Sequence, residues 1–138
     1  AGILVDGSTF ANSGTINIQF TEANDIGIFM ENAISFQNSA RMTIDIPKAE
    51  TAQGILRYTD NQANDFNWVN TEKGQITISV SNEGTAAATG GGTLAGMDLR
   101  SDRVIQFRNA DTLKVTVESA EPAYLSKVNW TSMQYFDT

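Results

Sequence analysis

The 138-residue sequence contains no histidine and no cysteine. Disulfides, zinc fingers, iron–sulfur clusters, thiol nucleophiles and histidine bases are therefore excluded. A serine–lysine pair is the main arrangement left for nucleophilic catalysis. The four lysines lie among polar turn residues or at outward strand positions, with no sign of the burial that activates a lysine. We therefore predict that the protein is not an enzyme.

Charged residues are also scarce. They make up 18% of the chain, and 9 Lys and Arg stand against 16 Asp and Glu, for a net charge of −7. This balance lacks the positive field that nucleic-acid binding needs. No apolar run approaches the roughly 20 residues that cross a bilayer as a helix, so we expect no membrane span. The neutral polar residues that replace charge are typical of β-proteins outside the cell, on the cell surface or in virions, and we predict such a location.

Alternation of apolar and polar residues is the dominant pattern, and it predicts strands with one buried face. The clearest segments are Ile16–Phe20, Met42–Ile46, Ile76–Val80 and Leu113–Val117. The core residues expected from this alternation are Ile16, Ile18, Phe20, Ile44, Ile76, Ile78, Val80, Leu113, Val115 and Val117. Shorter strands are expected at Gly2–Val5, Ile55–Tyr58, Phe66–Val69 and Val104–Phe107, and Tyr124–Phe136 reads as one long strand or two joined by a bulge.

Turn-forming residues separate these segments at intervals of about ten to fifteen residues. No internal repeat is apparent. The pattern predicts a single all-β domain over residues 1–138, a β-sandwich or jelly roll of about 8–10 mostly antiparallel strands. In residues 24–36 the apolar spacing fits either a helix or a strand; Gly27 favours the strand. Residues 84–92 read as a long loop between two strands.

The start of the chain is unusually apolar. Ile3, Leu4 and Val5 form a run that ends at Asp6 and Gly7. One interpretation makes this run the first strand of its own domain. In the other, residues 1–7 are a donated strand that inserts into a neighbouring copy, as in donor-strand complementation between pilins.

Two further groups of residues are candidates for binding. Four oxygen-bearing side chains within six positions are compatible with a calcium ion, the only cofactor we consider, but they are also ordinary turn residues. They are Asp60, Asn61, Asn64 and Asp65. Trp68 and Trp130 could stack on sugar rings, although a core role is the other interpretation of each.

These observations predict a non-enzymatic structural subunit that assembles with copies of itself through β-strand contacts. The subunit would belong to an extracellular filament, a pilus-like fibre or a virion shell. The alternative is a carbohydrate-binding β-sandwich module stabilised by calcium. Self-association separates the two, because the binding module would remain a monomer whose tryptophan fluorescence responds to sugar.

Overall fold

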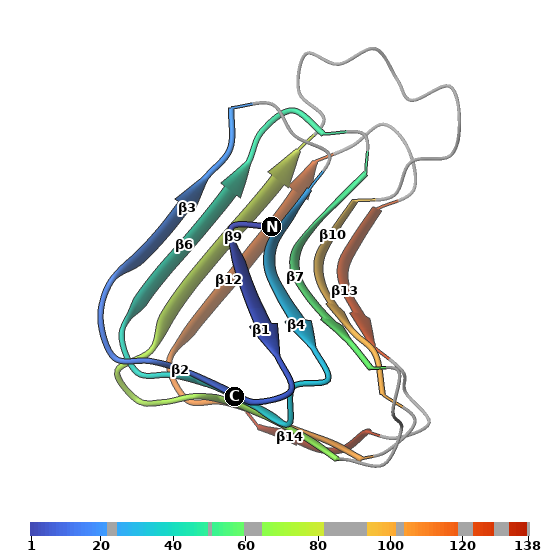
Figure 1. Cartoon of the computed structure of the whole chain (residues 1–138). Coiled ribbons are helices and arrows are strands. Elements are labelled where there is room, and N and C mark those ends of the chain that lie inside the picture. The colour runs from blue at the N-terminus through green and yellow to red at the C-terminus, as the bar shows by residue number, and fades with distance from the viewer. Residues whose placement is uncertain are drawn as a thin grey trace.

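In the computed structural model, the strands and turns wind around one axis into a structure with three flat sides, each of them a parallel sheet (Figure 1). We call one full circuit around this axis, which passes through sheets A, B and C in turn, a coil. The structure describes residues 1–21, 25–49, 51–59, 65–81, 94–101, 104–118, 123–128 and 133–137, the last two as backbone only. Successive strands pass from sheet A to sheet B to sheet C and back to sheet A, and every paired strand is parallel to its neighbour.

Each sheet collects every third strand of the chain. Sheet A contains β1 (Ile3–Asp6), β4 (Ile26–Glu31), β7 (Ala52–Tyr58), β10 (Leu94–Leu99) and β13 (Ala123–Val128). Sheet B contains β2 (Thr9–Asn12), β5 (Ser35–Asn38), β8 (Phe66–Asn70), β11 (Ile105–Asn109) and β14 (Met133–Asp137). Sheet C contains β3 (Ile16–Gln19), β6 (Arg41–Ile46), β9 (Gln75–Ser81) and β12 (Thr112–Glu118).

The predicted antiparallel sandwich or jelly roll is therefore wrong. Strands that follow one another in the sequence do not pair; each pairs with the strand one full coil away. Alternation reports that one face of a strand is buried, but it carries no information about the partner strand or its direction. The turns between successive strands are corners that lead from one sheet to the next.

The prediction of strand faces is confirmed in sheet C. Ile18, Ile44, Ile76, Ile78 and Val80 are buried. The other five predicted core residues also pack against the core, but they are only partly buried. These five lie at β3 and β12, the first and last strands of the sheet: Ile16, Phe20, Leu113, Val115 and Val117.

A row of glycines shapes sheet A. A Cβ on Gly27 would lie 2.5 Å from the carbonyl oxygen of Gly54 and 2.6 Å from Cγ2 of Ile44 in sheet C. A Cβ on Gly54 would lie 2.5 Å from the carbonyl oxygen of Gly96 and would also collide with Ile78. Sheet A thus approaches sheet C more closely than any side chain at these positions allows.

The ambiguous segment 24–36 contains strand β4 and the start of β5, so the strand interpretation is confirmed within its described residues. The stretch 124–136 contains parts of β13 and β14, which belong to different sheets. The predicted loop 84–92 lies outside the described residues. In the described part of the chain, no helix is long and apolar enough to cross a bilayer.

Candidate functional site

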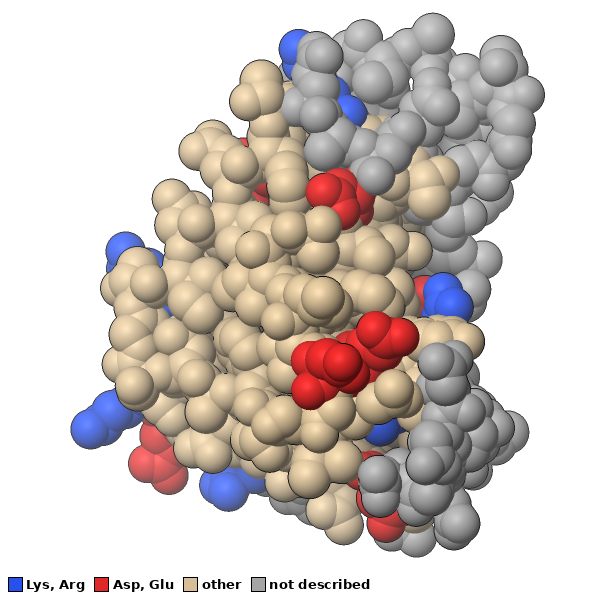
Figure 2. Space-filling model, in the orientation of Figure 1, with Lys and Arg blue, Asp and Glu red and all other residues tan. Residues whose placement is uncertain are grey.

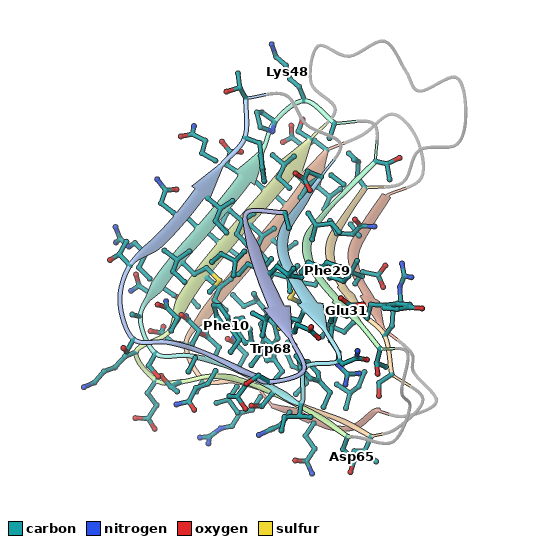
Figure 3. The ribbon with its side chains drawn as sticks, in the orientation of Figure 1. Phe10, Phe29, Glu31, Lys48, Asp65 and Trp68 are labelled. Atoms are coloured by element: carbon teal, nitrogen blue, oxygen red, sulfur yellow. The ribbon has the colours of Figure 1, made fainter. Side chains whose placement is uncertain are left out.

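The interior of the coil holds a stack of aromatic rings, one from each of four coils. Phe10 stacks on Phe36 with 5.1 Å between ring centroids, Phe36 on Trp68 with 3.9 Å, and Trp68 on Phe107 with 5.5 Å. Figure 3 shows Phe10 and Trp68 inside the coil. Parallel, in-register pairing of β2, β5, β8 and β11 produces this stack, because it places equivalent side chains directly above one another.

A ladder of buried asparagines runs beside the rings, where sheet B turns into sheet C. Nδ2 of Asn12 donates to Oδ1 of Asn38 at 2.8 Å, Asn38 donates to Asn70 at 2.9 Å, and Asn70 donates to Asn109 at 2.7 Å. Nδ2 of Asn38 and of Asn70 also donates to backbone carbonyls of the turns, including Ala40 and Gly74. These bonds satisfy polar groups that would be costly to bury without partners, so the ladder holds the corner together.

A buried arginine ties three coils together at the corner between sheets A and B. Nε and Nη2 of Arg57 donate to the carbonyl oxygen of Ala33, at 3.0 and 2.8 Å, and Nη1 donates to that of Arg100 at 2.7 Å. The guanidinium lies 4.7 Å from the centroid of the Phe66 ring. Burial lowers the pKa of Arg57 to about 10. All the hydrogen bonds described for this arginine remain inside the protein, so it is a structural residue.

The outer face of sheet A carries an acidic surface over β1 and β4. We call Leu4, Asp6, Phe29 and Glu31 the acidic face; Leu4 pairs with Phe29 and Asp6 with Glu31 across the two strands. Leu4 is 61% exposed, and neither carboxylate has an ion-pair partner among the described residues. Figure 2 shows acidic side chains in the middle of a largely uncharged face.

The next acidic side chain of the same sheet is neutralised. Asp98 is buried and accepts hydrogen bonds from Nη2 and Nε of Arg100, at 2.7 and 3.2 Å. The hydrogen bond to Asp98 raises the pKa of Arg100. The uncompensated negative charge of this sheet is therefore concentrated on the acidic face.

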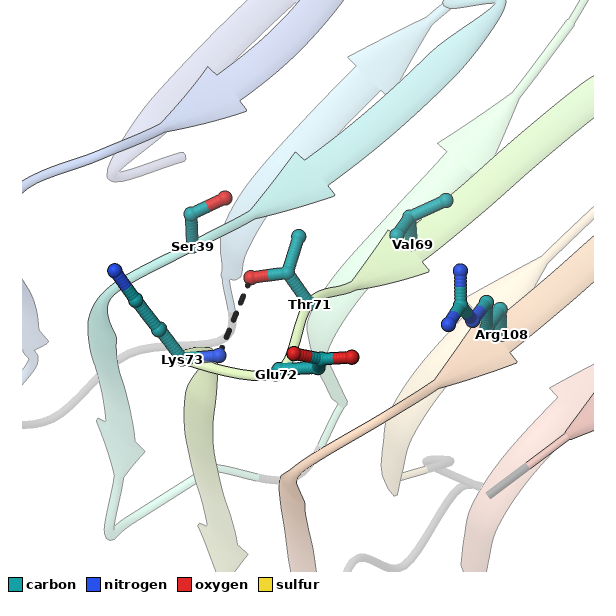
Figure 4. Close-up of a pocket in the computed structure, with 6 residues that line it drawn as sticks. All are labelled: Ser39, Val69, Thr71, Glu72, Lys73 and Arg108. Carbon is teal, nitrogen blue, oxygen red and sulfur yellow. Dashed lines mark hydrogen bonds between the residues drawn. The ribbon is translucent and has the colours of Figure 1, made fainter.

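A pocket of about 440 Å³ lies on the outside of the corner between sheets B and C (Figure 4). We call it the basic pocket; its lining residues are Ser39, Val69, Thr71, Glu72, Lys73 and Arg108. The backbone N–H of Lys73 donates to Oγ1 of Thr71 at 3.4 Å. Val69 and Arg108 are register partners on β8 and β11, and Asp137 of β14 is the partner of Arg108 on its other side. Two basic groups and one acidic group thus surround an apolar side chain.

The predicted assembly residues Ile3, Leu4 and Val5 lie in β1, which pairs with β4 of the same chain. Ile3 and Val5 pack against the core, and Leu4 points outward. In the described part of the chain, no strand pairs with the far edge of β1, or with the far edges of β2 and β3 in the other two sheets. Among the described residues, the first coil thus has one strand edge without a partner in each of the three sheets.

Of the residues predicted for calcium, only Asp65 is described; Asp60, Asn61 and Asn64 lie outside the described residues. Asp65 is exposed, and its Oδ1 accepts a hydrogen bond from the backbone N–H of Val104 at 3.2 Å. Within the described ranges, no group of three or more Asp or Glu side chains is arranged to hold a metal ion. The calcium site remains a prediction.

The two tryptophans predicted to bind sugar have different outcomes. Trp68 is fully buried between Phe36 and Phe107, so it has the core role that was its other interpretation and leaves no face for a sugar ring. Trp130 lies outside the described residues. Nε1 of Trp68 is buried without a hydrogen-bond partner among the described residues.

The asparagine ladder and the glycine row were missed by sequence reasoning. Both leave a signal in the sequence. An aromatic residue stands two positions before asparagine in 10–12, 36–38, 68–70 and 107–109, and the ladder asparagines are 26, 32 and 39 residues apart. The spacing grows along the chain, so a search for a fixed period does not find this repeat. The basic pocket left no comparable pattern.

Comparison of the chain with models of protein families, with curated protein sequences and with solved structures finds no match.

Proposed function

We propose that this protein is a non-enzymatic structural subunit that associates with copies of itself through the strand edges of its first coil. An extracellular filament, a pilus-like fibre or a virion surface is the setting that fits this role. The proposal keeps the assembly predicted from the sequence and replaces the donated strand by a shared strand edge.

Incomplete burial of the first coil is the observation that carries the proposal. Ile3 and Val5 are partly buried, whereas their register partners Ile28 and Met30 in the second coil have no exposed surface. Ile16 differs from Met42 in the same way in sheet C. Another copy on this edge would complete the burial of inward-facing apolar side chains, which favours association.

The charge of the first coil supports the same surface. Residues 1–20 contain one charged side chain, Asp6, and no lysine, arginine or proline. Proteins commonly use proline, lysine or other charged residues to keep free strand edges from pairing with another chain. Short strands of four residues each limit the contact that a single sheet can make, so all three sheets would contribute.

The test introduces charge at the edge without touching the core. Ala11→Lys with Asn17→Lys alters exposed, outward positions of β2 and β3. The matched control is Gln37→Lys with Thr43→Lys, which changes their register partners one strand further in. Sedimentation velocity of the full chain over rising concentration should show association of the native protein and the control, and its loss in the edge variant.

Two results would overturn the proposal. One is a native chain that stays monomeric at every concentration; the other is an edge variant that associates as the native chain does. Circular dichroism of each variant checks that the fold is retained, so that loss of association is not confused with unfolding.

A further inference from the structure

We infer that a second interface joins copies side by side, with the acidic face of one copy docked on the basic pocket of the next. The inference rests on the proposed self-association, but it uses surfaces other than the strand edges. The partner is therefore another copy of this chain.

Charge complementarity is the first argument. The acidic face presents Asp6 and Glu31 with no basic partner among the described residues. The corner from sheet B to sheet C, taken as the turns and the strand residues next to them at 39–41, 71–75 and 108–114, contains four basic and two acidic side chains. Acidic groups therefore predominate on one surface and basic groups on the other, in a protein whose net charge of −7 otherwise opposes self-association.

Shape and apolar content are the second argument. Leu4 is 61% exposed beside the two carboxylates, and its register partner Phe29 is partly exposed. The basic pocket has Val69 among its lining residues and a volume within the range of about 300–1,000 Å³ that is usual for binding pockets. Leu4 can enter this pocket while the carboxylates meet Lys73 and Arg108 at its rim.

The positions of the two surfaces decide the kind of assembly. Sheet A lies on one side of the coil, and the corner between sheets B and C lies on the opposite side (Figure 1). A contact between two different surfaces repeats from copy to copy; it gives a ring where the rotation between copies closes and an open row where it does not, and surfaces on opposite sides favour the open row. The expected product is a row of molecules that lie side by side with their axes parallel. Stacking through strand edges would instead add molecules along the axis.

Charge reversal tests the contact. Asp6→Lys with Glu31→Lys makes both surfaces basic, and Lys73→Glu with Arg108→Glu makes both acidic. Neither variant should form rows alone, and the concentration for half-association should rise at least about tenfold. An equimolar mixture should form them again, because each reversed surface then meets an opposite one.

Asp45→Lys with Glu118→Lys, on β6 and β12 of sheet C, is the control for net charge and should behave as the native protein.

The mixture separates this inference from the proposed function. A lysine at position 6, on the edge strand β1, could also weaken edge stacking, but Lys73→Glu with Arg108→Glu leaves the strand edges of the first coil unchanged and tests the side-by-side contact alone. Restoration in the mixture supports the side-by-side interface. If each reversed variant associates like the native chain, or if the mixture stays dissociated while the native chain and the control associate, the inference is overturned.

The absence of cysteine allows a second, direct measurement. Leu4→Cys and Val69→Cys are made in separate chains, mixed and oxidised mildly with oxidised glutathione. A disulfide-linked heterodimer is expected, in excess over the two homodimers. A mixture of Thr77→Cys with Val69→Cys serves as the control, because Thr77 is exposed on β9 in the middle of sheet C, away from the acidic face and from the strand edges of the first coil. Equal yields from both mixtures would contradict the side-by-side contact.

Discussion

Sheets A and C run through the same coils but are built by different rules. In sheet C, isoleucine and valine alternate with polar residues, and the inward side chains stack in register from β6 to β9. In sheet A, Gly27 and Gly54 place backbone without a side chain in the interior, and Arg57 places a guanidinium there. Where the two sheets meet, sheet C supplies the side chains of the contact, and the glycines of sheet A leave the space that these side chains fill.

The largest effect is expected where the two sheets meet. Gly54→Val would drive its side chain against the carbonyl oxygen of Gly96 and against Ile78, and backbone cannot yield as a flexible side chain can. We expect the free energy of unfolding to fall by about 4 kcal/mol or more. Urea denaturation measures the loss. Gly14→Val is the control, since nothing lies within 4 Å of a Cβ there; similar losses in both would show that the contact between sheets is not the cause.

A smaller effect is expected within sheet C. Ile78→Ala removes a fully buried side chain from β9 and should cost about 3 kcal/mol, by lost burial and a residual cavity. Val115→Ala removes its register partner on β12, which is only partly buried, and should cost about 1 kcal/mol. The same denaturation experiment compares them. Equal costs would mean that β12 is as well covered as β9.

The smallest of the three losses at fully buried positions concerns the arginine of sheet A. Arg57→Lys keeps the charge but loses the planar group that reaches the carbonyls of Ala33 and Arg100, which lie on different coils. A loss of about 2 kcal/mol is expected. Arg41→Lys, at an exposed position of β6, should change stability by less than about 0.5 kcal/mol. An Arg57→Lys variant as stable as the native chain would show that the fork of hydrogen bonds is dispensable.

The contrast between the sheets also explains what could be predicted. The strands of sheet C and their buried faces follow from alternation alone. Sheet A was recognised only in part: its Ile55–Tyr58 stretch was expected, whereas Leu94–Leu99 was not, because every residue of β10 is buried and no alternation remains to be seen. Of the surfaces proposed to mediate assembly, the apolar run at Ile3, Leu4 and Val5 was visible in the sequence, and the basic pocket was not.

The sequence by itself determined the all-β class, the inward faces of the alternating strands and the exclusion of histidine and cysteine chemistry. These depend on residue identity and on the two-residue period of a strand. Only the tertiary structure decided that the strands pair in parallel across whole coils, that Asn12, Asn38, Asn70 and Asn109 form one ladder, and that an acidic face and a basic pocket lie on opposite sides. The physical reason is that pairing joins residues 25 to 42 positions apart through corners of unequal length, and local patterns carry no record of such distances.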